Sequence, residues 1–397
     1  MTLASRMDNL GTETAFEVLA KARVLEAQGK EIIHLEIGEP DFDTPKHIVE
    51  AGVQALRDGQ THYGPTAGLP QLREAIARNS REVRGIDTDP SHVVVTPGAK
   101  PIMFYVILAL AEPGVEVIHP NPGFPIYESM IRFAGATPVP MQLLESKGYH
   151  PDLDDLAQKI TSKTRLIIIN SPENPCGSAL TKEELETIAN LVKDRDDIYV
   201  MSDEIYKDIL YTGEHHSIAA FPGMAEKTII LDGFSKSYAM TGWRLGYGIM
   251  PPELVLPVVK LAVNSVSCAA TFSQLAAVAA LDGPQDDVQA MLAEFTQRRR
   301  LIADGLRSIP GINCPEPEGA FYAWPDVTEV CKKTGMKDSA ELANRLLHEA
   351  GVAVLADAHF GTPVPGEGEH LRFSYACSIE QIDLGLDKIR VYLEGLL

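Results

Sequence analysis

This sequence of 397 residues lacks long apolar runs, paired cysteines and any excess of basic residues. No uncharged stretch approaches the length that crosses a membrane, and residues 1–6 lack the apolar core of a secretion signal. The five cysteines are scattered without a C-x-x-C pair or a zinc-like spacing, which favours reduced thiols. We therefore expect a cytoplasmic protein with no metal site and no membrane partner.

Basic charge is scarce, with 35 Lys and Arg against 55 Asp and Glu, so the formal net charge is -20. This charge would repel a polyanion and argues against nucleic acid as a partner. We interpret the one basic run, Arg298 to Arg300, as a solvated helix face. The length and the 45% content of hydrophobic residues allow two domains and a large core.

Apolar strands alternate with amphipathic helices through the first two thirds of the chain. The expected strands cover residues 92–96, 115–119, 166–170, 198–202 and 228–231, and the helices lie near 101–111, 123–134, 152–160 and 182–195. This alternation predicts an α/β fold: a large domain with a mostly parallel, doubly wound sheet covered on both faces. The active sites of such sheets collect at the carboxyl ends of the strands.

After about residue 285 the sequence changes to long charged helices with short strands around 320–324 and 371–375. This indicates a smaller α+β domain. The predicted division is 1–45 for an N-terminal arm and part of the small domain, 46–285 for the large domain, and 286–397 for the small C-terminal domain. We expect Thr44 to cap the helix that follows Pro45, and the Gly- and Pro-rich loop 357–369 to form a mobile lid.

Lys236 directly follows an apolar strand and is surrounded by hydroxyl and small side chains. Partial burial lowers the pKa of a lysine, and lysine is the side chain that forms Schiff bases. Arg244, eight residues later, begins another apolar run, so both cations can flank one anionic group. The alternative is a surface lysine in a turn with a strand-edge arginine.

Other strands also end in residues with chemical potential. Gly98, Ala99 and Lys100 lie between a strand and a helix, where free backbone N–H groups can hold a phosphate. Asp203 could keep a pyridine nitrogen protonated, and Tyr206 could donate a hydrogen bond to a phenolate oxygen. A plain connection, an aspartate cap and a core tyrosine are the alternatives.

Three further residues fit a ligand site by residue type. Asn174 precedes a proline in a turn, Phe124 could stack on an aromatic ring, and Arg372 alternates with apolar neighbours on a strand. The planar guanidinium of an arginine can hold a carboxylate through two parallel bonds. The alternatives are a turn residue, a core phenylalanine and an edge-strand salt bridge.

The stretch 233–246 resembles the lysine signature of class I aminotransferases, enzymes of fold type I that use pyridoxal 5'-phosphate. The resemblance runs from Gly38 to Arg372, nearly the whole chain. It implies that the large domain binds the cofactor, with Lys236 as the Schiff-base lysine. The implied activity is amino transfer between an L-amino acid and a 2-oxo acid, in which Lys236 moves the proton of the substrate Cα.

The resemblance also implies a role for each candidate residue. The implied cofactor contacts are Gly98, Ala99, Lys100, Ser235 and Arg244 around the phosphate, Asp203 at the pyridine nitrogen, Asn174 and Tyr206 at the phenolic oxygen, Phe124 on the ring face, and Tyr63 reaching the neighbour's phosphate in a homodimer. The implied substrate contacts are Arg372 and Gly38 at the α-carboxylate, with Asn174, Phe124 and Lys100 nearby. The implied catalytic residues are Lys236, Asp203 and Tyr206.

The substrate side chain is the most open question. In prokaryotic-type aspartate aminotransferases that resemble this chain, a lysine at the position of Lys100 meets the distal carboxylate of the substrate. Hydroxyls from the N-terminal segment assist it, and Thr12 and Thr14 fall at those positions. We therefore favour aspartate or glutamate as the amino donor.

Several features support other functions. Glu13, Glu17 and Asp357 add negative charge near the expected site, and Phe124 replaces a tryptophan that aspartate-specific relatives often carry. A transaminase for neutral, aromatic or cationic amino acids is thus an alternative. The same fold hosts pyridoxal phosphate-dependent lyases, and aminotransferase-like domains also serve as ligand sensors in regulators. The roughly 40 residues before Gly38 leave little room for the DNA-binding domain that a regulator needs.

Overall fold

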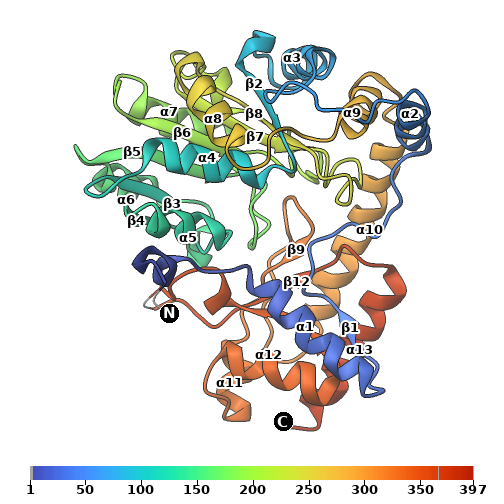
Figure 1. Cartoon of the computed structure of the whole chain (residues 1–397). Helices are drawn as coiled ribbons and strands as arrows, with labels where there is room; N and C mark the ends of the chain where they lie inside the picture. The colour runs from blue at the N-terminus through green and yellow to red at the C-terminus, as the bar shows by residue number, and fades with distance from the viewer. Residues whose placement is uncertain (1–2, 365, 397) are drawn as a thin grey trace.

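The computed structural model describes residues 3–364 and 366–396. Met1, Thr2, Pro365 and Leu397 lie outside the described residues, so one position of the predicted lid loop is among them. Figure 1 shows a large sheet with helices packed on it and, below it in that view, a smaller group of helices and short strands.

Seven strands form the large sheet in the order β2-β8-β7-β6-β5-β3-β4. They are β2 (Val93–Thr96), β3 (Glu116–Asn121), β4 (Thr137–Gln142), β5 (Thr164–Asn170), β6 (Tyr199–Asp203), β7 (Thr228–Gly233) and β8 (Gly246–Ile249). In this sheet β8 alone runs opposite to the other strands, since it pairs in antiparallel fashion with both β2 and β7. The predicted α/β fold with a mostly parallel sheet is confirmed.

Helices cover both faces of this sheet, because the central strands carry apolar side chains on both faces. The helices of this part are α2 (Lys46–Arg57), α3 (Pro70–Arg84), α4 (Lys100–Leu110), α5 (Ile126–Phe133), α6 (Leu153–Lys159), α7 (Lys182–Val192), α8 (Pro252–Val263) and α9 (Thr271–Asp282). Ile168 and Met201 pack towards α4, α5 and α8, whereas Ile167 and Val200 pack towards α6 and α7.

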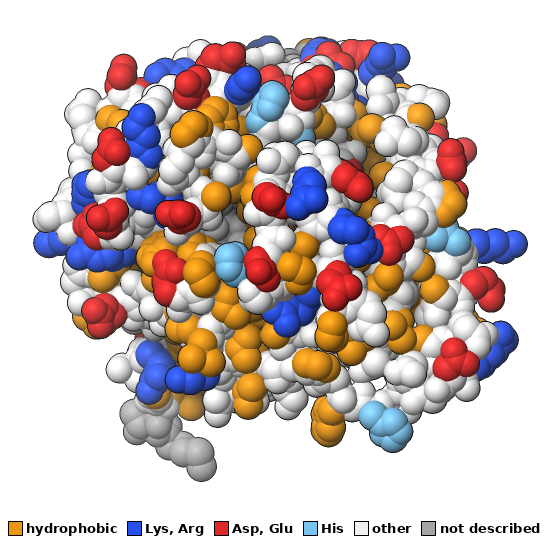
Figure 2. All heavy atoms as spheres, turned by 90° about the horizontal axis from the view of Figure 1, so that it is seen from above, with side chains coloured by type: hydrophobic (Ala, Val, Ile, Leu, Met, Phe, Trp, Pro, Cys, Tyr) orange, Lys and Arg blue, Asp and Glu red, His pale blue; other side chains and the backbone are white. Residues whose placement is uncertain are grey.

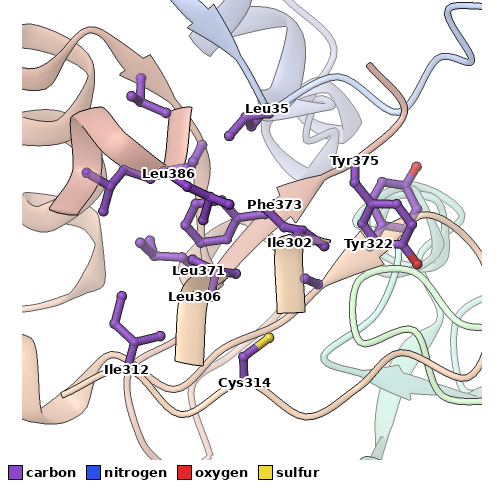
Figure 3. Packing of buried hydrophobic residues seen from close by; sticks show 14 of the residues in the cluster. Leu35, Ile302, Leu306, Ile312, Cys314, Tyr322, Leu371, Phe373, Tyr375 and Leu386 are labelled. Atoms are coloured by element: carbon purple, nitrogen blue, oxygen red, sulfur yellow. The ribbon is translucent and has the colours of Figure 1, made fainter. Parts of the chain in front are cut away.

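The smaller part combines the N-terminal segment with the C-terminal third of the chain. Strand β1 (Ile33–His34) pairs in parallel with β10 (Val352–Ala353), and Leu35 joins a core that contains Ile302, Phe373 and Leu386 (Figure 3). The remaining elements are η1 (Ser5–Asn9), α1 (Thr14–Ala27), α10 (Asp286–Arg307), β9 (Tyr322–Ala323), α11 (Thr328–Thr334), α12 (Ser339–Arg345), η5 (Leu346–Ala350), β11 (Leu355–Ala356), η6 (Asp357–His359), β12 (Leu371–Ser374) and α13 (Ile379–Glu394).

Two local predictions are wrong. The Thr44 hydroxyl does not cap α2: it donates to the Ala239 carbonyl at 2.7 Å and accepts from the Trp243 indole at 3.0 Å, which ties the start of α2 to the Lys236 loop. Arg298 and Arg299 are not solvated, because each forms an ion pair and lies over an aromatic ring. Each of the two guanidinium groups is paired with an acid inside the fold.

The surface seen in Figure 2 carries acidic and basic side chains interspersed with hydrophobic ones. Within residues 3–364 and 366–396, none of the helices has the length and apolar character needed to traverse a bilayer.

Candidate active site

A cavity of about 460 Å³ contains most of the predicted site residues. It lies at the carboxyl ends of β5, β6 and β7, where the small part of the molecule meets the sheet. The predicted residues that line it are Gly38, Ala99, Lys100, Phe124, Asn174, Asp203, Tyr206, Ser235, Lys236, Arg244 and Arg372. Tyr63 is not among them; its side chain is 92% exposed on the surface.

Lys236 extends into this cavity from the loop after β7. Burial lowers the pKa of its amine to about 8, and the negative charges of Glu13 and Glu39 oppose that shift. The amine donates a hydrogen bond to the carbonyl of Gly38. A lysine with this pKa is partly neutral near pH 7 to 8, so it can act as a nucleophile and as a base.

Asp203 is the last residue of β6 and is buried. Burial raises the pKa of its carboxyl to about 6, while a hydrogen bond from the Tyr127 hydroxyl at 2.6 Å favours the charged form. The backbone N–H of Ile205 donates to the other carboxylate oxygen at 3.2 Å. A buried carboxylate that makes no ion pair within the described residues stabilises a ligand that carries positive charge into the cavity.

An anion-binding cup forms where α4 begins. Gly98 has a φ of +86°, and a Cβ placed there would lie 2.4 Å from Nη2 of Arg244. A Cβ on Gly246 would lie equally close to the N–H of Ala99, at 2.4 Å. The guanidinium therefore rests against the glycine turn, next to Ser235 and the positive end of α4.

Arg372 is held rigidly on β12 with a donor to spare. Its guanidinium lies between the rings of Tyr322 and Phe360, 4.4 Å and 4.8 Å from their centroids. It donates to Asn174 Oδ1 at 2.9 Å and to the carbonyl of Glu36. Arg372 also lines the cavity, and these two hydrogen bonds leave further N–H groups of its guanidinium available for a ligand carboxylate.

Tyr322, a residue to which the sequence assigned no role, organises this side of the cavity. Its hydroxyl lies 2.8 Å from that of Tyr206, and a Cβ on Gly38 would come within 1.9 Å of it. Gly38 thus leaves room for Tyr322. Tyr127 and Tyr322 were missed because each lies in a stretch that reads as ordinary core, on α5 and on β9.

The wall for the substrate side chain differs from the prediction. Lys100 forms an ion pair with Glu13, and its ammonium lies 5.3 Å from the centroid of the Phe124 ring and 5.9 Å from that of Phe16. Glu13 lines the cavity, but its neighbours Thr12 and Thr14 line an adjoining hollow instead. The placement of the two threonines gives no support to the expected assistance, which stays a prediction.

Asp357 also departs from its predicted position beside the site. Its carboxylate accepts hydrogen bonds from Ser339, Ala358 and His370, and it does not line the cavity. Asp357 therefore anchors the loop that follows β11, and its charge is already compensated there.

The donor set fits pyridoxal phosphate. The glycine turn, Ser235 and Arg244 suit its phosphate, Asp203 suits a protonated ring nitrogen, and the Lys236 amine suits its aldehyde. Arg372 is left for a substrate carboxylate. This arrangement can bind an amino acid, remove a proton from its Cα and stabilise the charge that results.

Comparisons with known proteins point to the same chemistry. The sequence model of the family "Aminotransferase class I and II" matches residues 30–389. An aspartate aminotransferase of Geobacillus stearothermophilus is 37% identical over 397 residues, covering 100% of both chains. The solved aspartate aminotransferase of Rhizobium meliloti has a TM-score of 0.94 at 32% identity, with 100% of both chains covered. That of Thermus thermophilus, solved with maleate, has a TM-score of 0.91 at 36% identity and covers 98% of this chain and 99% of its own.

Proposed function

Because the chain belongs to the family of class I and II aminotransferases, we propose that it moves the amino group of aspartate or glutamate to a 2-oxo acid. The transaminase activity predicted from the sequence is confirmed by the family match and by the full-length relatives. Pyridoxal phosphate is characteristic of this family, and the donor set above supports its binding here. The lyase and ligand-sensor alternatives receive no support from these relatives.

Lys100 is the observation that carries the choice of substrate. A dicarboxylate needs two cationic contacts in one cavity, and Arg372 supplies only the first. Lys100 lines the same cavity from α4, on a different element, and it is not required for holding Arg372 or Asp203 in place. A cation at this position favours a substrate with a second carboxylate.

The residues divide the reaction between them. When bound, pyridoxal phosphate supplies an electron sink that stabilises negative charge at the substrate Cα. Arg372 would hold the α-carboxylate, and the Lys236 amine would take the proton from Cα, as its pKa of about 8 permits. Asp203, kept charged by Tyr127, would hold the ring nitrogen in its protonated form.

The test is Lys100→Ala, assayed with aspartate and with alanine. A charge-assisted contact contributes roughly 1.5–3 kcal/mol to binding, and the variant lacks it. Therefore kcat/KM for aspartate should fall about ten- to a hundredfold, while that for alanine changes little. Lys193→Ala, on an exposed lysine away from the cavity, serves as the control. A wild-type enzyme that already prefers alanine, or a variant that loses both activities equally, contradicts the choice of substrate.

We further propose a cytoplasmic homodimer in which Tyr63 reaches the partner's phosphate. Its side chain is 92% exposed in a single chain, and α8 and its continuation expose Leu256, Val263 and Val266. Exposed apolar side chains of this kind are typical of subunit interfaces. We also propose the division into domains at residues 45 and 285, and the pairing of β1 with β10 supports the assignment of the N-terminal segment to the smaller domain.

A further inference from the structure

Glu13 already pairs with Lys100, the cation that the proposed function assigns to the distal carboxylate of the substrate. It directly precedes α1, at the position where a side chain would normally cap a helix, yet it makes no capping hydrogen bond. Its carboxylate instead pairs with Lys100 inside the cavity. A carboxylate of the chain thus lies where the distal carboxylate of a substrate must bind.

The pair is suited to exchange. The side chains of Lys100 and Glu13 are 48% and 23% exposed, and neither has another ion-pair partner among the described residues. Ion pairs with this degree of exposure are weak, because water and salt screen them. A ligand carboxylate placed beside Lys100 can therefore replace the carboxylate of Glu13.

The chain around Glu13 can move without disturbing the core. The 3-10 helix η1 buries no residue, and residues 3–12 are all exposed. One hydrogen bond, from Gly11 N–H to Ser129 Oγ at 2.9 Å, holds this arm to α5. Figure 1 shows the arm as a short dark-blue helix followed by a segment that runs below α5, in that view, to α1.

When Glu13 stays paired with Lys100, the surroundings of Lys100 suit an apolar side chain of the substrate. The rings of Phe16 and Phe124 lie near the ammonium, and Met103 lines the same cavity. An unpaired ammonium beside an apolar ligand would lose hydration without compensation. Paired with Glu13, it is neutralised within the wall, and the two rings can contact an apolar side chain.

We propose that Glu13 determines specificity as an internal carboxylate: it pairs with Lys100 when the substrate side chain is uncharged and leaves when the substrate brings a second carboxylate. This inference rests on the proposed function, since it assumes that Lys100 receives the distal carboxylate. One cavity then accepts, in alternate half-reactions, a dicarboxylic and an apolar amino acid or 2-oxo acid.

The experiment measures binding to the cofactor-loaded enzyme by calorimetry, with two ligands that have no amino group. Maleate represents the dicarboxylate, and 3-phenylpropionate represents an apolar side chain with one carboxylate. In Glu13→Gln, Lys100 loses its internal partner, so maleate should bind about tenfold more tightly and 3-phenylpropionate about threefold more weakly. Glu17→Gln, which removes the same charge one turn further along α1 with no contact to Lys100, should change each dissociation constant by less than about twofold.

Two further variants separate the possible failures. Lys100→Ala should weaken maleate, and adding Glu13→Gln to it should restore none of the affinity. If Lys100→Ala weakens maleate but Glu13→Gln leaves both ligands unchanged, the role of Glu13 is overturned while the proposed function stands. If Lys100→Ala binds maleate as wild type does, the proposed function itself fails. Equal weakening of both ligands in Glu13→Gln, with the melting temperature unchanged, also overturns the role of Glu13.

Discussion

Two buried carboxyl groups lie beside the proposed reaction site, and burial raises the pKa of each. The pKa of Asp203 is raised to about 6 and that of Glu173 to about 8. Asp203 receives the Tyr127 hydroxyl and a backbone N–H, which favour its charged form. Glu173 accepts the N–H of Cys176 at 2.7 Å, and its second oxygen has no partner within the described residues. We therefore test the charge of Asp203 through the reaction rate and the protonation of Glu173 through protein stability.

Asp203→Asn keeps the shape of the side chain and removes its charge. We expect the cofactor to remain bound and kcat to fall roughly a hundred- to a thousandfold, the scale on which preorganised charges act. Single-turnover absorbance with aspartate, at matched cofactor content, measures this. A rate within about threefold of wild type, less than half a power of ten, would place the charge of Asp203 outside the mechanism.

Glu173→Gln tests the buried acid through stability. The folded-state pKa of about 8 is above the unfolded value near 4.5, so the folded protein binds more protons and loses stability as pH rises between these values. The amide oxygen of the substituted side chain would accept the same N–H without ionising. The melting temperature of the variant should therefore exceed that of wild type by a margin that grows from pH 5 to pH 8. The corresponding difference in the free energy of unfolding grows by at most about 1.4 kcal/mol per pH unit. A constant difference across this range contradicts the ionisation of Glu173.

Most of the residues predicted from the sequence lie at the ends of strands or just after them. Lys236 and Asp203 could be found because strand order brings such positions to one edge of the large sheet, and Arg372 could be found because it is a cation that alternates with apolar neighbours on β12. Tyr322 and Glu13 could not, because they come to the cavity through the packing of the N-terminal segment and β9 onto the sheet. Such contacts between distant segments leave no local pattern.

At the scale of elements, the loop between β7 and β8 and the start of α4 form one unit. Ala239 and Arg244 both have positive φ, of 49° and 51°, in the loop that also carries Ser235, which with Arg244 is proposed to contact the phosphate. A backbone held in this region by its surroundings is typical of ligand-binding loops. The Thr44 hydroxyl contributes by bonding to Ala239 and Trp243.

Gly98→Ala tests this unit. Alanine at this position must adopt the same left-handed φ of +86°, and its Cβ would lie 2.4 Å from Arg244. The dissociation constant for pyridoxal phosphate should therefore rise at least about tenfold. Gly85→Ala is the matched control, since Gly85 has a φ of +69° and nothing within 4 Å of its Cβ. It should lower the melting temperature without affecting cofactor affinity. Equal loss of affinity in both variants would show that backbone strain alone is responsible.

The strands of the large sheet were predictable because their apolar runs are short, continuous and bounded by turn residues. Strand β4, with the sequence Thr137 to Gln142, was not found, since its two prolines argue against a strand; it lies at the edge of the sheet, where proline is tolerated. The burial of Arg298 and Arg299 was missed for a related reason: composition shows the charge but not the distant acids that pair with it.

At the scale of the whole molecule, the account requires two chains. Tyr63 lies on the surface of one chain, away from its own cavity, so its proposed phosphate contact must be made across a two-fold axis. Lys236→Ala and Tyr63→Phe subunits, mixed under exchange, should regain activity above that of either parent, up to about a quarter of wild type. This is because the mixed dimer joins both defects in one site and leaves the other intact. No regain despite proven exchange contradicts the shared site.

The central claim, that the Lys236 amine is the group through which this chain works, has a direct chemical test. Borohydride reduction of the protein loaded with pyridoxal phosphate, followed by peptide mass spectrometry, should place the reduced cofactor on Lys236. Prior treatment with aspartate should remove that label, because the amino group then displaces the lysine. A label on Lys100 or another lysine, or full turnover by Lys236→Ala without added amines, would contradict the account.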